Sequence, residues 1–153
     1  MYLHFEGKVF KQNQVLLTIA PVYFSNNLWL EVLQAGFESN NLTTNQYSKA
    51  PGRAQAKGVN MQHFLGSVDN KPVATLTLTF LNDSVRIDNV ATCPNFQGLG
   101  YASKMLQFGL ELAQNKNCKY GFLDASAKGL GIYKRFGFSE IFQYNCYCKD
   151  SEI

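Results

Sequence analysis

The sequence predicts an α/β (α+β) fold with a mixed, mostly antiparallel central sheet and helices on both faces. Three alternating apolar segments follow one another between Met61 and Thr92 with short polar turns between them, which predicts an antiparallel meander. A helix-periodic segment then leads to a further apolar strand at 119–125, and a strand reached through a helical crossover lies parallel to the one before it. We expect the whole chain, 1–153, to form one domain.

Composition and charge argue against several classes of protein. The net charge of +3 is small and the basic residues are scattered, so nothing favours a nucleic-acid partner. The sequence shows no signal peptide and no apolar run of about eighteen residues, so secretion and a membrane partner lack support. The four cysteines fit no metal-ligand spacing, so we expect no metal site, free thiols and a cytoplasmic location. They are Cys93, Cys118, Cys146 and Cys148.

The N-terminal third is the part that the sequence defines least. Gln14–Phe24 reads as a strand, and Pro21 within it indicates an edge strand or a strand end. A helix should follow and run to about Glu38, because polar N-cap candidates precede apolar residues at helical spacing. The caps are Ser25, Asn26 and Asn27, and the residues at helical spacing are Leu30, Leu33 or Gln34, and Phe37, with Trp29 and Val32 beside them. Pro51 and Gly52 predict a short broken helix plus loop over 39–58.

The middle of the chain gives the clearest elements. Met61–Val68 and Pro72–Leu81 form a predicted hairpin, and the second strand alternates apolar residues with threonines. After the third strand and its helix, Lys119–Ala125 is the predicted parallel strand. Ser126 is an N-cap for a short helix at 127–136 that Gly137 ends, and one or two closing strands are expected in Phe138–Lys149.

The segment VRIDNVATCPNFQGLGYASKML, residues 85–106, carries most of the functional signal. Its alternation slips by one residue at Asp88 and Asn89, which predicts a β-bulge where backbone groups are left without a strand partner. Pro94 ends the strand, and a glycine-rich turn opens a helix that runs to about Asn115. Glycines before a helix N-terminus let an anion approach unpaired N–H groups, so we expect a phosphate group there. The buried helix face should contain Ala102, Met105, Leu106, Gly109, Leu110 and Ala113.

Two motifs in this part of the chain resemble those of the GCN5-related N-acetyltransferases. Gln97, Gly100 and Ala102 match the family's Q/R-x-x-G-x-G/A motif, after an apolar strand and a proline. Leu123–Phe138, LDASAKGLGIYKRFGF, is similar to the family's second signature of strand end, short helix with Tyr, and Gly-Phe. The motifs occur in the right order, and the resemblance covers roughly Met61–Tyr147.

The resemblance implies direct transfer of an acetyl group from acetyl-coenzyme A to a primary amine, without a covalent enzyme intermediate. Its pantetheine arm would pair with the bulged strand, its pyrophosphate would bind at the helix N-terminus, and an N–H group near Val90 would stabilise the oxyanion. The implied cofactor-binding residues are Val90, Ala91, Thr92, Gln97, Gly98, Leu99, Gly100, Tyr101, Ala102, Ser103 and Ser126. The acceptor, small molecule or peptide, is not defined by the sequence, and a monomer and a homodimer are both compatible with it.

Two residues are candidates for proton transfer. The resemblance places Tyr133 where the family has a tyrosine that protonates the departing thiolate, although a tyrosine on an apolar helix face is also a common core residue. Asp88 is the carboxylate nearest in sequence to the expected reaction centre, with a merely tolerated bulge residue or a water chain as alternatives. Ser126 can serve as a helix cap instead of contacting the cofactor, and His4 and His63 are expected to be structural.

Other functions fit the sequence less well. Gly98, Gly100 and Ser103 give G-x-G-x-x-S, which lacks the third glycine of a dinucleotide-binding turn, and no G-x-x-x-x-G-K-[ST] string occurs. Cys93 has no partner for nucleophilic catalysis. The remaining alternative is a non-catalytic protein of the same fold that binds an acyl-coenzyme A or another protein.

Overall fold

The structure, a computed structural model, describes residues 1–23, 25–39 and 41–145, with the backbone alone for 41–48. Six strands form one sheet in the order β1-β6-β5-β4-β3-β2, and only the β5–β6 pair is parallel. The strands are β1 (Tyr2–His4), β2 (Thr18–Val22), β3 (Asn60–Val68), β4 (Lys71–Leu81), β5 (Ser84–Thr92) and β6 (Tyr120–Phe122). The predicted mixed, mostly antiparallel sheet is therefore confirmed.

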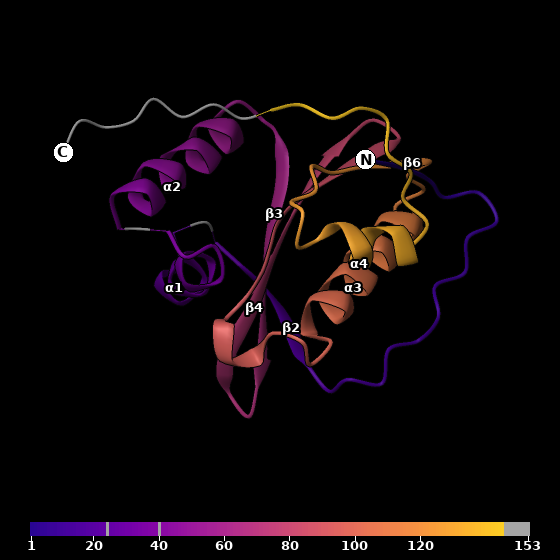
Figure 1. Ribbon diagram of the computed structural model, residues 1–153. Coiled ribbons are helices and arrows are strands. Elements are labelled where there is room, and N and C mark those ends of the chain that lie inside the picture. The colour runs from indigo at the N-terminus through magenta and orange to yellow at the C-terminus, as the bar shows by residue number, and fades with distance from the viewer. Residues whose placement is uncertain (24, 40, 146–153) are drawn as a thin grey trace.

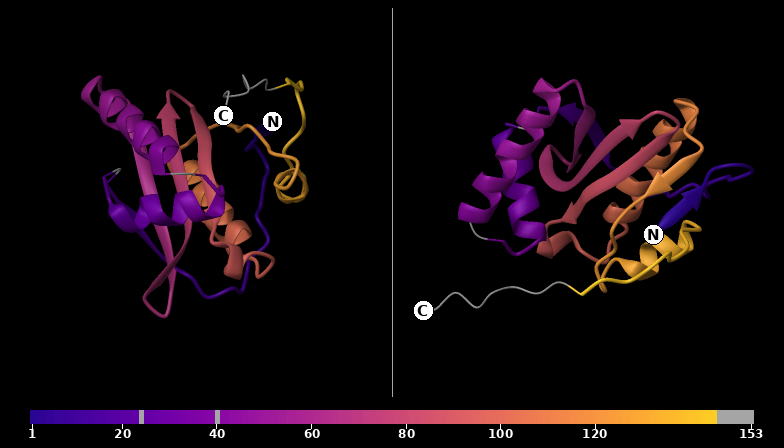
Figure 2. Two further views of the ribbon diagram at one scale, coloured as in Figure 1. Left: turned by 60° about the vertical axis from the view of Figure 1, so that its left-hand side comes forward. Right: turned by 90° about the horizontal axis from the view of Figure 1, so that it is seen from above.

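Helices cover both faces of this sheet, as the sequence predicts. Figure 1 shows α1 (Asn27–Gly36) and α2 (Asn41–Ala56) on one side and α3 (Tyr101–Asn115) and α4 (Leu130–Arg135) on the other. The same two layers are visible when the molecule is turned (Figure 2). Among the described residues, no helix combines the length and the apolar character needed to cross a bilayer.

Each layer of helices buries its own apolar cluster. The cluster under α3 joins Met105, Leu106 and Leu110 to the α3-facing residues of β4 and β5, which include Leu76, Leu78, Val85 and Ile87. The cluster under α1 consists of Trp29, Val32, Leu33, Leu65 and Ala91. Full burial of each large apolar side chain contributes about 1.5–3 kcal/mol. The predicted face of α3 is confirmed except for Ala102, which is only partly buried. In α1, Phe37 is exposed, and Trp29 and Val32 lie on the buried face.

The antiparallel meander and the bulge are both confirmed. Strands β3, β4 and β5 pair in sequence order. In the β4–β5 pair, Thr75 lies opposite Ala91 and Thr77 lies opposite Asp88, so two residues of β5 face the single residue Leu76. Asn89 takes up the extra residue with φ of 55°, a left-handed conformation that Asn tolerates better than most residues.

Two predictions for the first 58 residues need correction. Residues 39–58 contain one helix, α2, which continues through Pro51 and Gly52, so the broken helix was wrong. Pro51 is buried, and packing of its ring offsets the backbone hydrogen bond that a helical proline gives up. The strand predicted at Gln14–Phe24 is confirmed only for Thr18–Val22, where β2 is the sheet edge that Pro21 predicts. Phe24 lies outside the described residues.

The C-terminal part also differs from the prediction. No strand forms in the described residues of Phe138–Lys149, where Ser139 makes only an isolated bridge to Tyr2, and 146–149 lie outside the described part. The N-terminal strand β1 pairs with β6 instead and forms that edge of the sheet. The parallel strand is shorter than predicted, and α4 begins only at Leu130, because a turn that Ser126 caps precedes it. Gly137 does end the helix region with φ of 88°.

Gly36 brings α1 into close contact with β5, and this contact gives a stability prediction. A Cβ at position 36 would lie 2.8 Å from Ala91 Cβ and 3.0 Å from the backbone N of Thr92, neither of which can rotate away. We expect Gly36→Ala to lower the free energy of unfolding by about 1–3 kcal/mol in urea denaturation. Gly131→Ala is the control, because its Cβ would meet only Arg135 Nη1 at 3.8 Å, and an alanine in helix α4 should be neutral or stabilising. Equal effects of the two variants would contradict this account.

Candidate active site

Strands β5 and β6 separate halfway along β5. Their parallel pairing covers Ser84–Arg86 of β5 and Tyr120–Phe122 of β6, and β6 ends there. From Ile87 to Thr92 the edge of β5 on this side has no strand partner among the described residues. Backbone N–H and C=O groups along such an edge are available to a ligand that carries amides of its own.

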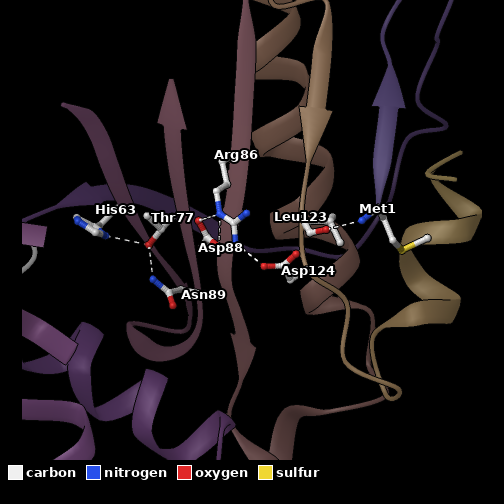
Figure 3. A network of polar contacts seen from close by, with 8 residues as sticks. All are labelled: Met1, His63, Thr77, Arg86, Asp88, Asn89, Leu123 and Asp124. Carbon is white, nitrogen blue, oxygen red and sulfur yellow. Dashed lines mark hydrogen bonds and ion pairs between the residues drawn. The ribbon is translucent and has the colours of Figure 1, made fainter. Parts of the chain in front are cut away.

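Two buried threonines of β4 hold the bulge of β5 in place. Thr75 Oγ1 donates to the backbone O of Asn89 at 2.8 Å, and the Asn89 side-chain amide donates to Thr77 Oγ1 at 2.9 Å. Both threonine side chains are fully buried under the α1 layer, so these hydrogen bonds are shielded from water. Figure 3 shows Thr77 between Asn89 and His63. The conformation of β5 before Val90 is therefore fixed by side chains from its neighbour.

His63 lies at the other end of this hydrogen-bond chain. Its Nδ1 is 2.9 Å from Thr77 Oγ1, while Nε2 is buried without a partner in the described part of the chain. The ring packs edge-on against Trp29, with the ring centroids 4.9 Å apart. Burial lowers the pKa of His63 from its usual 6.5, because the charged imidazolium would lose its hydration. A neutral, structural His63 agrees with this environment.

The buried imidazole predicts a loss of stability in mild acid. The pKa of His63 is lower in the folded protein than in the unfolded chain. The stability that the neutral imidazole contributes is therefore fully present above pH 6.5 and is lost as the pH falls through the folded pKa. Below pH 6.5 the unfolded chain binds this proton more readily than the folded protein, with a slope of up to about 1.4 kcal/mol per pH unit. We expect His63→Gln to remove this slope in urea titrations between about pH 5 and 6.5. If the free energy of unfolding changed with pH in the same way for the wild type and His63→Gln, the prediction would be wrong.

An arginine joins the two separating strands on the α1 side of the sheet. Arg86 Nε lies 3.1 Å from both carboxylate oxygens of Asp88, and its Nη2 lies 2.6 Å from Asp124 Oδ2, just beyond β6 (Figure 3). The hydrogen bond from Arg86 is the main reason why the pKa of Asp124 is lowered. Asp88 behaves differently, because burial raises its pKa while Arg86 partly opposes that rise. The two carboxyl groups therefore differ in basicity although they share one guanidinium.

The negative charge of Asp88 affects the pKa of Tyr133. Tyr133 is buried in the cluster under α3, and burial is the main cause of its raised pKa, with the negative charge of Asp88 adding to the effect. The phenol therefore stays protonated at neutral pH and can donate a proton or a hydrogen bond. The two residues that the sequence marks for proton transfer therefore lie within electrostatic range of each other.

The glycine-rich turn lies between the end of β5 and helix α3. Gly98 and Gly100 have φ of 76° and 89°, conformations that glycine adopts without strain. A Cβ at Gly98 would have no atom within 4 Å, so the backbone is accessible there. No described side chain caps the N-terminus of α3, which leaves the first-turn N–H groups of Tyr101, Ala102 and Ser103 for a ligand.

Two predicted cofactor residues already have structural hydrogen bonds. Gln97 Nε2 donates to the backbone O of Thr92 at 3.1 Å and so ties the turn to the end of β5. Ser126 Oγ accepts from the backbone N of Gly129 at 3.2 Å, which is the capping role considered for it. Ser126 also lines a pocket of about 540 Å³ at the end of β6. The other lining residues are Met1, Asp124, Ala125, Ala127, Leu130, Glu140, Phe142, Gln143, Tyr144 and Asn145.

Several residues that shape the site have no local signal in the sequence. The alternation of β4 places Thr75 and Thr77 on one face, but it does not show that they contact the bulge. The contact between Arg86 and Asp124 joins residues 38 positions apart and depends on how β5 and β6 align. Only the unusual run of threonines in an otherwise apolar strand could have pointed to buried hydrogen bonds.

Comparison with known proteins places this geometry in a family. The sequence model of the acetyltransferase (GNAT) family matches residues 27–138. No curated protein sequence matches the chain significantly.

Solved structures share the fold at low sequence identity. Glucosamine-6-phosphate N-acetyltransferase from Arabidopsis thaliana is 18% identical with a TM-score of 0.65, covering 88% of this chain and 100% of that one. A predicted acetyltransferase from Clostridium acetobutylicum, solved with acetyl-CoA, is 19% identical with a TM-score of 0.68, covering 87% and 96%. PaiA N-acetyltransferase from Thermoplasma acidophilum, solved with coenzyme A, is 10% identical with a TM-score of 0.65, covering 82% and 91%. The family match extends over most of the chain, and the chain belongs to the acetyltransferase (GNAT) family.

Proposed function

We propose that this protein transfers an acetyl group from acetyl-CoA directly to a primary amine. The observation that carries the proposal is the unpaired edge of β5 at 87–92, which leads into the accessible glycine turn of α3. Structures of similar fold were solved with acetyl-CoA or coenzyme A, which supports this cosubstrate. A pantetheine arm carries two amides and fits an unpaired strand edge, while a pyrophosphate fits the first turn of a helix.

The proposed arrangement assigns a role to each part of the site. Pantetheine pairs with Val90, Ala91 and Thr92, and pyrophosphate binds N–H groups between Gly98 and Ser103. The Thr92 hydroxyl is buried without a partner among the described residues, so this strand end has hydrogen-bonding capacity to offer. An N–H group near Val90, held by the bulge, stabilises the oxyanion that forms on the thioester.

The chemical step needs one base and one acid. Asp88 takes a proton from the acceptor ammonium, and the neutral amine attacks the thioester carbonyl carbon. The C–S bond then breaks, and Tyr133 donates its phenolic proton to the departing thiolate. The extra proton on the acylated nitrogen is released through solvent and restores the Tyr133 phenol, which leaves a neutral amide. The raised pKa values of both groups suit these roles, because they make Asp88 a better base and keep Tyr133 protonated.

An acceptor screen tests the proposed function. The protein is incubated with acetyl-CoA and separate pools of small amines, peptides with a free N-terminus and lysine-containing peptides, and acetylated products are identified by mass spectrometry. We expect protein-dependent acetylation in at least one pool, and the pool identifies the acceptor class. Binding of acetyl-CoA without any acetylated product would favour the non-catalytic alternative. Absence of both binding and product would contradict the proposal.

A further inference from the structure

The segment between β1 and β2 contacts the helix that begins at the glycine turn. It runs on the α3 side of the sheet, as the indigo trace in Figure 1 shows. Its side chains alternate from residue 13 onward, with Asn13, Val15 and Leu17 partly buried and the residues between them exposed. This alternation continues into β2 as far as Ala20, and Leu17 packs against the apolar cluster under α3. We call residues 13–17 the strap.

Asn13 fixes the strap to α3 through an unusually complete set of hydrogen bonds. Its backbone N donates to Gln107 Oε1 at 2.9 Å, and its side-chain amide donates to the backbone O of Gly100 at 3.2 Å. Its backbone O accepts from Lys104 Nζ at 2.8 Å. Its Oδ1 accepts from the backbone N of Val15 at 2.9 Å. Three of these four bonds reach α3 or the residue that precedes it.

Gln107 shows that this contact is built into the core. Its side chain is only 3% exposed, and its amide group also donates to Glu111 Oε1 at 2.7 Å. A buried glutamine without partners would cost about 1–3 kcal/mol per unsatisfied group. The strap therefore satisfies a buried polar side chain while it holds the start of the same helix.

The bond from Asn13 to Gly100 supports the orientation of the backbone at the start of α3. In a trans peptide the C=O and the following N–H point in opposite directions. The O of Gly100 accepts from the Lys104 backbone N at 3.0 Å within α3 and also from Asn13 Nδ2, so both bonds hold the N–H of Tyr101 facing away from that oxygen. Val15 supports the inner side of the turn, since its Cγ2 lies 3.0 Å from the position of a Cβ on Gly100. The opposite side, at Gly98, is open.

We propose that Asn13 is a positioning residue for the pyrophosphate of the coenzyme. This inference rests on the proposed function, and it assigns a role in the cofactor site to a residue outside the matched family region of 27–138. Asn13 adds a second hydrogen bond to the helical one at Gly100 O and so restrains the peptide unit between Gly100 and Tyr101 in the orientation that directs an N–H group at the ligand. Its backbone O also accepts from Lys104 Nζ at 2.8 Å, which adds a further bond between the strap and the first turns of α3.

The test compares a ligand that contains the pyrophosphate with one that lacks it. The dissociation constant of coenzyme A is measured by calorimetry, and that of pantetheine by competition, for the wild type, Asn13→Ala and Gln14→Ala. Loss of the Asn13 side-chain bonds should weaken coenzyme A binding about tenfold. Pantetheine binding should stay unchanged. Gln14 is exposed and serves as the neighbouring control, so Gln14→Ala should bind both ligands as the wild type does.

A second variant keeps the test informative if Asn13→Ala loosens the strap. Asn13→Asp retains an acceptor for the Val15 N–H but places a carboxylate oxygen against the O of Gly100. It should weaken coenzyme A binding by more than tenfold, with a loss that shrinks as salt screens the charge. Equal weakening of both ligands, or unchanged coenzyme A affinity in both Asn13 variants, would overturn the inference while leaving the proposed function intact. A wild-type protein that does not bind coenzyme A would overturn both.

Discussion

Tyr133→Phe should reduce kcat by about 10²–10⁴-fold, the range for loss of a general acid. The substitution removes one oxygen atom and leaves the ring that packs against Phe138, with centroids 6.1 Å apart. The KM for acetyl-CoA should change little, because the proposed cofactor contacts are backbone groups of β5 and α3. Steady-state kinetics with an acceptor from the screen provide the measurement.

Tyr120→Phe is the matched control for this variant. Tyr120 is the first residue of β6, at the end where β5 and β6 are still paired, and its ring stacks on His4 and Tyr2. The kcat of Tyr120→Phe should equal that of the wild type. A Tyr133→Phe enzyme that keeps full kcat would show that Tyr133 is a core residue and that water protonates the thiolate.

Asp88→Asn should lower kcat/KM by about 10²–10⁴-fold near neutral pH, as expected for loss of a general base. Asp88 must be ionised to accept a proton, so the wild-type rate should fall as the pH drops through its pKa. Burial places that pKa above the usual 3.8. The variant should lack this acidic limb of the pH profile. Measuring kcat/KM of both enzymes from acidic to neutral pH shows the lower rate of the variant near neutrality and the loss of its acidic limb separately.

Asp83→Asn controls for the loss of a carboxylate. Asp83 precedes β5 at its far end and lies 3.5 Å from Lys119 Nζ in an exposed ion pair. This variant should retain both the rate and the acidic limb. If Asp88→Asn also retained them, the proton would leave through a water chain, and Asp88 would serve only to hold Arg86 at the junction of β5 and β6.

Local sequence patterns predicted the elements that form the centre of the site. Alternation of apolar residues is enough to identify β3, β4 and β5, because each strand has one face on the α3 cluster. The slip at Asp88 and Asn89 identified the bulge, since an extra residue must shift the alternation. The glycines before α3 were recognisable because a left-handed backbone near a helix start strongly favours glycine.

The remaining features depend on contacts between distant segments. The N-terminal segment and the C-terminal segment both have the sequence of a short strand, and local patterns do not show which of them pairs with β6. In the structure β1 pairs with β6. The strap residue Asn13 contacts Gly100, which is 87 positions away, and its neighbours in sequence give no sign of that contact. The continuous helix α2 was missed because proline lowers local helix propensity but does not report the burial of its own ring.

Residue-resolved amide hydrogen exchange with and without acetyl-CoA tests whether the coenzyme binds along β5 and at the start of α3. We expect slower exchange at the amides of Val90 to Thr92 and Tyr101 to Ser103 when acetyl-CoA is added, because these N–H groups are proposed to bind the pantetheine arm and the pyrophosphate. Amides in β2 and α2 should be unaffected. Protection confined to the pocket around Asp124 and Phe142, or no protection at β5 and α3, would contradict the proposed site.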